Sequence, residues 1–123
     1  MALSGGVLVC HNDQMTTHVL PAFLRENYEI HEWRHATAIL CEDFQSELND
    51  ICEVLTGFRL LKSHIGVGGG NKSSVSASID SEFYRRGWAE KMFATKIIVD
   101  DAEMDSPTHS VDCFKNRVAL EIE

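Results

Sequence analysis

Three carboxylates near the end of the 123-residue sequence could do chemistry together. If Asn116-Arg117 forms a two-residue turn, the flanking segments pair as a hairpin in which Asp112 lies opposite Glu121. Glu123 then lies on the same face, because side chains alternate along a strand. Like charges opposite each other destabilise a sheet, and a hard divalent cation with oxygen ligands would compensate them. This spacing favours metal-assisted hydrolysis, and the alternative is an exposed strand with ordinary acidic side chains on its solvent face.

A second candidate site matches HExxH, the zinc protease signature, at His31-Glu32-Trp33-Arg34-His35. Histidines four residues apart on a helix could bind one zinc ion, with Glu32 as the general base. Two observations count against this function. Arg34 takes a position that is usually apolar, and only 30 residues precede the motif. A zinc metalloprotease is therefore kept as an alternative, next to two partly exposed histidines at a helix N-terminus without a ligand.

The longest element that could position these residues is a helix from about His31 to Leu55. Its apolar side chains recur with a period of 3.6 residues, and Gly57 is well placed to end it. The apolar face consists of Trp33, Leu40, Phe44, Leu48, Ile51 and Leu55. The opposite, acidic face is expected to be solvated and consists of Glu42, Asp43, Glu47, Asn49, Asp50 and Glu53.

Shorter elements are expected on both sides of this helix. A strand is predicted over residues 6–11, and a helical piece over Asp80–Arg86 with Asp80 or Ser78 as N-cap and Gly87 as its stop. Residues 93–99 are predicted to form a further strand, and residues 111–123 the carboxylate hairpin. Together these elements predict a mixed α/β fold.

Composition limits what kind of protein this is. The 19 Asp and Glu against 11 Lys and Arg give a net charge of −8, which argues against nonspecific coating of nucleic acid but is compatible with a metal site. No apolar run approaches the roughly 20 residues that a membrane span needs, and no signal peptide is evident, so a cytosolic protein is expected. On one helix, Cys41 and Cys52 would lie roughly 16 Å apart, too far for a disulfide. Buried free thiols are expected.

The end of the sequence is unusual for a domain. It stops within the alternating pattern of residues 119–123, without a turn or a cap. We therefore expect residues 1–123 to be the N-terminal portion of a single domain, truncated at the strand that carries Glu121 and Glu123.

The segment from Asp112 to Glu123 resembles the D-x8-E-x-[Q/E] active-site hairpin of type II restriction endonucleases of the BglII/BstYI group, which belong to the PD-(D/E)xK nucleases. Residues 79–90 are similar to a segment that precedes the hairpin in those enzymes. The resemblance implies a restriction-endonuclease-like α/β core. It also implies a prokaryotic, cytoplasmic homodimer of a restriction-modification system that cleaves double-stranded DNA at short palindromes with Mg²⁺.

Carried over by position, the resemblance makes Asp112 and Glu121 the metal ligands and includes Glu123 in the catalytic set. Glu123 falls where many of these nucleases have lysine and the nearest group has glutamine, so it could be a general base, a further ligand or both. Because the core continues after this hairpin in the family, we expect no sequence-specific cleavage by the 123-residue chain alone. A non-catalytic interaction fragment is the remaining alternative.

The glycine-rich segment 66–74 has two interpretations. Asn71 replaces the second glycine of a GxxxxGK[ST] motif, so a nucleotide-binding loop is not expected. The segment is either a linker or a loop whose N–H groups, with Lys72 and Ser73, contact a DNA phosphate. Arg85 and Arg86 are similar candidates, although cations also favour a helix C-terminus by themselves.

Overall fold

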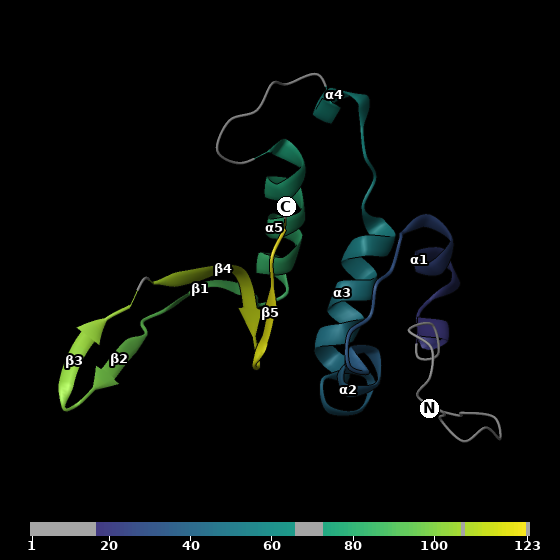
Figure 1. Cartoon of the computed structure of the whole chain (residues 1–123). Coiled ribbons are helices and arrows are strands. Elements are labelled where there is room, and N and C mark those ends of the chain that lie inside the picture. Colours follow the sequence, from purple (N-terminus) through teal and green to yellow (C-terminus); the bar gives the residue numbers. More distant parts are fainter. Residues whose placement is uncertain (1–16, 66–72, 107, 123) are drawn as a thin grey trace. The chain divides into compact units, whose positions relative to one another are not determined.

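The computed structural model describes residues 17–65, 73–106 and 108–122 (Figure 1). The chain divides into two compact units, Met1–Thr56 and Gly57–Glu123, and each is described by itself. Helix and sheet are both present, which confirms the mixed α/β class. Among the described residues, no helix combines the length and apolar character needed to cross a bilayer. The expected strand at 6–11 lies outside the described residues.

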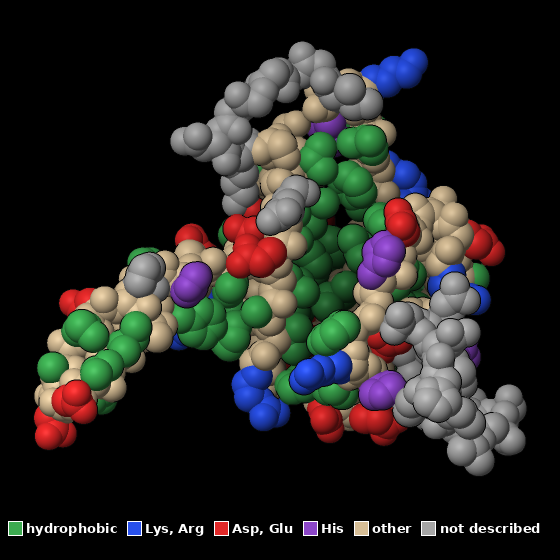
Figure 2. All heavy atoms as spheres, in the orientation of Figure 1, with side chains coloured by type: hydrophobic (Ala, Val, Ile, Leu, Met, Phe, Trp, Pro, Cys, Tyr) green, Lys and Arg blue, Asp and Glu red, His purple; other side chains and the backbone are tan. Residues whose placement is uncertain are grey.

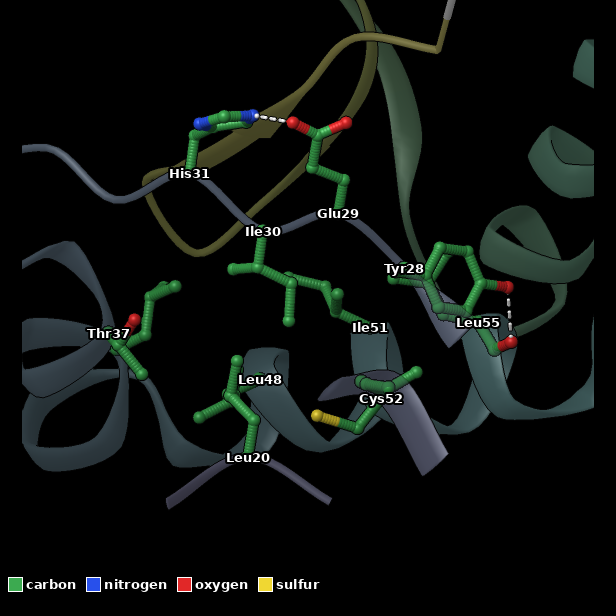
Figure 3. Close-up of a pocket in the computed structure, with 12 residues that line it drawn as sticks. Leu20, Tyr28, Glu29, Ile30, His31, Thr37, Leu48, Ile51, Cys52 and Leu55 are labelled. Carbon is green, nitrogen blue, oxygen red and sulfur yellow. Dashed lines mark hydrogen bonds and ion pairs between the residues drawn. The ribbon is translucent and has the colours of Figure 1, made fainter. Parts of the chain in front are cut away.

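The described part of the first unit, from Thr17 onward, is helical. It contains the 3-10 helix η1 (Thr17–Val19) and the helices α1 (Ala22–Asn27), α2 (Ala36–Asp43) and α3 (Gln45–Gly57). Its buried apolar side chains are Leu24, Leu48 and Val54. The hydroxyl of Tyr28 donates to the carbonyl of Leu55 at 2.6 Å and so ties the end of α1 to α3. Beside this bond lies an apolar pocket of about 300 Å³, with Ile30, Leu48, Ile51 and Cys52 among its lining residues (Figure 3).

The single helix expected from His31 to Leu55 is wrong, because the structure has two helices. The chain turns before Ala36, where Arg34 and His35 take left-handed φ angles of 50° and 58°. Phe44 breaks the helix with φ −136° and ψ 41°. Side chains on either side of such a break no longer share one continuous face, so the 3.6-residue register does not run through it.

Three expectations that depended on that helix are corrected with it. Trp33 lies before α2 and is 75% exposed, so it is no core residue. Glu47, placed on the solvated face, is 5% exposed because α3 starts a new register at Gln45. Cys41 and Cys52 lie on α2 and α3, not on one helix; both thiols are free as expected, but they are half-buried and not buried.

The described residues of the second unit form two helices and five strands. The helices are α4 (Lys62–Ile65) and α5 (Ser74–Arg85). The strands are β1 (Ala89–Phe93), β2 (Lys96–Val99), β3 (Ala102–Asp105), β4 (His109–Lys115) and β5 (Val118–Leu120). Strands β1, β4 and β5 form an antiparallel sheet in the order β1-β4-β5, and β2 pairs with β3. Phe83, Trp88 and Cys113 form its buried apolar core.

Helix α5 is longer than predicted. It begins at Ser74, not at Asp80, because the hydroxyl of Ser73 accepts a hydrogen bond from the N–H of Ser76 and caps the helix there. Its predicted stop at Gly87 is confirmed, with φ of +83° at that glycine. The N–H of Trp88 donates to the carbonyl of Phe83 and the two rings meet edge to face at 5.4 Å, which is a Schellman cap with its apolar contact.

The strand expected at 93–99 is divided between β1 and β2. The ribbon formed by β2 and β3 has one apolar face, because Ile97 lies opposite Met104 and Val99 opposite Ala102. Ile97, Val99 and Met104 are each about half exposed. Figure 2 shows apolar and acidic side chains mixed along this ribbon.

Candidate active-site hairpin

The hairpin of β4 and β5 has the turn and the register that the sequence predicts. Asn116 and Arg117 form the turn with φ of 45° and 69°, the left-handed pair required by a type I′ turn. The paired residues are Lys115 with Val118, Phe114 with Ala119 and Cys113 with Leu120. The ladder ends there, so Asp112 and Glu121 lie one step beyond its last pair.

Asp112 lies at an irregularity of the sheet. Lys91 of β1 pairs with Val111, whereas Ala89 pairs with Phe114, so two residues of β4 face Glu90 alone. This is a β-bulge, a feature that redirects side chains and is common beside active sites. Glu90 is the residue opposite the bulge, and its carboxylate accepts a hydrogen bond from the hydroxyl of Ser110 at 2.9 Å.

The side chain of Asp112 joins the bulge to the end of the hairpin. Its Oδ2 accepts a hydrogen bond from the N–H of Ile122, with 2.9 Å between the two atoms. Asp112 is partly buried and Glu121 is exposed. This bond replaces the ladder after Leu120 and holds the backbone that follows Glu121 beside Asp112. Asp112 and Glu121 therefore belong to neighbouring positions of two adjoining segments.

These residues offer oxygen ligands for a hard cation. Mg²⁺ is usually held by one or two carboxylates together with water and substrate phosphate, so Asp112 and Glu121 suit it chemically. The described part of the chain contains no group of three His, Cys, Asp or Glu side chains close enough to hold a metal ion. Glu123 lies outside the described residues.

The family model of the restriction endonuclease BglII/BglIII matches residues 28–123. This chain belongs to the BglII/BglIII restriction endonuclease family. No curated protein and no solved structure matches it. The predicted resemblance is thereby confirmed, and membership makes the chain part of a family of endonucleases that bind DNA.

In this family member, helix α5 supports the strand that carries Asp112. The hydroxyl of Tyr84 donates to the backbone carbonyl of Asp112 at 3.3 Å. One residue further, the thiol of Cys113 lies 3.8 Å from Oδ1 of Asp80. Asp80 and Cys113 are almost fully buried, at 2% and 0% exposed. The buried contact with Asp80 shows that Cys113 faces the helix.

The sequence analysis did not predict that Asp80 and Tyr84 contact strand β4. Asp80, or alternatively Ser78, was expected to be the N-cap of a shorter helix, because aspartate and serine are common at that position. The structure instead buries it in the middle of α5, four residues before Tyr84 and on the same helix face. The sequence does not reveal that this face of α5 packs against β4, so the burial of Asp80 could not be predicted.

The predicted phosphate-contact residues are only partly described. Ser73 is the N-cap of α5, and its hydroxyl lies 2.9 Å from that of Ser76. Lys72 lies outside the described residues. Arg85 and Arg86 both form ion pairs with Glu82, and the pair of Arg86 with Glu82 measures 3.0 Å.

The alternative zinc site required His31 and His35 to lie on one helix, and the structure does not show such a helix. His31, Glu32 and His35 all precede α2, so the two histidines do not lie one turn apart on a helix. His31 pairs with Glu29 at 2.9 Å, and Oε1 of Glu32 accepts a hydrogen bond from the N–H of Thr37 at 2.9 Å. Glu32 thus serves as a cap for the first turn of α2, a structural role that HExxH spacing alone does not distinguish from catalysis.

Proposed function

We propose that this chain carries the metal site of a type II restriction endonuclease, which hydrolyses DNA phosphodiester bonds with Mg²⁺ at Asp112 and Glu121. The proposal extends the family membership to a particular reaction, metal and set of residues. The observation that carries it is the hydrogen bond from the Ile122 N–H to Asp112, at a bulge and beside Glu121. As in the sequence prediction, the enzyme would be a cytoplasmic homodimer of a restriction-modification system that acts on double-stranded DNA.

Each carboxylate has a distinct role in this proposal. Asp112 is oriented by the Ile122 N–H through one oxygen, which leaves its other oxygen available as a ligand. Glu121 is exposed and supplies a second ligand on the adjoining segment. Glu123 remains the predicted residue for removing a proton from the attacking water, for a further ligand position, or for both. A bound Mg²⁺ would lower the pKa of a coordinated water and offset charge on the phosphate.

The metal site can be tested without any cleavage assay. Titration of the purified chain with Mn²⁺ should release or absorb heat with about one ion bound, and Glu121→Ala should abolish that heat. Glu103→Ala is the matched control, because Glu103 is an exposed strand carboxylate paired only locally, with Lys96 at 3.0 Å. Equal heats for the Glu121→Ala variant and the parent would overturn the assignment.

Cleavage is tested separately. If the domain continues beyond residue 123, as we expected, the purified chain with Mg²⁺ should not cut a supercoiled plasmid at discrete sites. Discrete fragments would contradict that expectation while supporting the nuclease itself.

A further inference from the structure

Cations gather at the end of the β4–β5 hairpin that is remote from Asp112. Arg85 and Arg86 end helix α5, while Lys115 and Arg117 border the hairpin turn. The ammonium group of Lys115 donates to the carbonyl of Arg86 at 2.8 Å, which brings the helix end and the turn together. Figure 2 shows Lys and Arg side chains at this turn, whose position is visible in Figure 1. We call these four residues the turn cluster.

The charge of the turn cluster is opposite to that of the chain. Four of the 11 Lys and Arg residues lie in it, in a chain of net charge −8. Glu82 pairs with both Arg85 and Arg86. The side chain of Arg85 nevertheless remains 69% exposed, and Arg117 is exposed as well. A positive surface thus faces solvent beside the catalytic hairpin.

Arg117 occupies a backbone position that does not favour arginine. Its φ of 69° is left-handed, and the second position of a type I′ turn is most often glycine. A side chain held in such a conformation costs stability, and such positions are often found at functional sites. The turn therefore carries a guanidinium group where folding alone would favour glycine.

The favourable effect of cations at a helix C-terminus explains only part of the turn cluster. Arg85 and Arg86 lie in the last turn of α5, where they complement the helix dipole. Arg117 belongs to the turn between two strands and has no helix end of its own. The helix dipole therefore does not explain the cation at the hairpin turn.

We propose that the turn cluster binds the phosphates of the DNA strand that flank the cleavage position, with Arg117 and Arg85 as the contacting residues. The inference rests on the proposed function, because the cluster and Asp112 share one hairpin. Four residue steps along β4 lead from Asp112 to the first turn residue, Asn116, a span of roughly 13 Å. One strand of a duplex carries about four phosphates over that length of helix axis. Guanidinium groups also match phosphate oxygens in geometry.

The test measures affinity for a 20-bp duplex by fluorescence anisotropy in EDTA, at several salt concentrations. Arg117→Gly should weaken binding about five- to tenfold at 0.1 M salt and reduce the salt slope by about 0.9, irrespective of base sequence. The melting temperature should not fall, because glycine suits the turn. Arg34→Gly is the matched control, since Arg34 is also exposed, with φ of 50°, but precedes α2 in the other unit.

Each outcome separates this inference from the metal site. Equal affinities for the Arg117→Gly variant and the parent, equal losses for the two variants, or no duplex binding by the parent would overturn the phosphate contact. Mn²⁺ binding by the same proteins reports on Asp112 and Glu121 independently. If Arg117→Gly weakens duplex binding as expected but the parent gives no heat with Mn²⁺, the phosphate contact is supported and the metal assignment is overturned.

Discussion

Asp112 and Ile122 are joined by a hydrogen bond of 2.9 Å from the backbone N–H of Ile122 to Oδ2 of Asp112. The bond lies where the ladder of β4 and β5 has ended, after the pair Cys113–Leu120. The side chain of Asp112 thus holds the two segments together where backbone pairing between the strands has ended. Because Asp112 keeps one oxygen outside this bond, it can act as a structural link and as a ligand together.

The hydrogen bond of Asp112 and its proposed role as a metal ligand predict different effects for two substitutions. Asp112→Asn retains an acceptor for the Ile122 N–H, so its free energy of unfolding should stay within about 1 kcal/mol of the parent. Asp112→Ala leaves that partly buried N–H without its acceptor and should cost about 1–3 kcal/mol. Both should lose Mn²⁺ binding.

Urea unfolding in EDTA measures the stabilities of the two Asp112 variants without a contribution from bound metal. Equal stabilities would show that the hydrogen bond to Ile122 contributes nothing measurable. Retained Mn²⁺ binding in the Asp112→Asn variant would remove Asp112 from the ligand set.

Ser73 is predicted to stabilise helix α5 as its cap. Ser73→Ala removes the acceptor of the Ser76 N–H, 3.1 Å away, and should cost about 1 kcal/mol of unfolding free energy. Ser81→Ala is the control within the same helix, because Ser81 is exposed, bonds only to the carbonyl of Ser78, and alanine favours helix. Thermal and urea unfolding of both variants check the difference. A DNA affinity lowered by the Ser73 change, with unchanged stability, would instead indicate the phosphate contact expected from the sequence.

Glu32 is predicted to cap α2 and not to assist a zinc ion. Glu32→Ala should cost about 1 kcal/mol by removing the acceptor for the Thr37 N–H, whereas Glu32→Gln retains an acceptor oxygen and should cost less. Purified protein should contain no stoichiometric zinc, and replacing His31 and His35 by alanine should leave its metal content unchanged. Elemental analysis decides this point, and zinc lost upon the histidine changes would revive the protease alternative.

The hairpin could be predicted because its determinants are local. Asn116 tolerates a left-handed φ, alternation sets the two strands, and a two-residue turn then allows only one register. The same logic could have found the turn between β2 and β3, where Asp100 and Asp101 have φ of 48° and 63°. No turn was predicted there, because aspartate is also common in irregular loops.

The remaining errors arise from contacts between segments that are distant in sequence. Asp80 is buried against Cys113, 33 residues away, and nothing in the helix around it indicates that partner. The break at Phe44 keeps apolar residues on both sides, so hydrophobic spacing alone indicated one helix. The bulge beside Asp112 depends on the pairing of β4 with β1, which short-range patterns do not specify.

Two cysteine thiols are predicted to ionise at a higher pH in the folded chain than in the unfolded chain. Burial raises the pKa of the Cys52 thiol above its ordinary value of 9.0, and the nearby Cys41 raises it further. Burial also raises the pKa of Cys41, with a smaller contribution from Glu42. A raised pKa means that the unfolded thiols ionise first, so the stability that these groups contribute is complete below pH 9 and is lost as the pH rises through the folded values.

Alkylation by iodoacetamide, followed by mass spectrometry of peptides, checks the thiol prediction because only the thiolate reacts. At pH 8 both Cys41 and Cys52 should react more slowly in the folded chain than in urea, and their rates should rise steeply above pH 9. Cys113, with 0% exposure, is the internal reference and should react slowest at every pH. A folded Cys52 that reacts as fast as the unfolded one would contradict the raised pKa. The free energy of unfolding should be lower at pH 10 than at pH 8, since ionised thiols favour the unfolded chain.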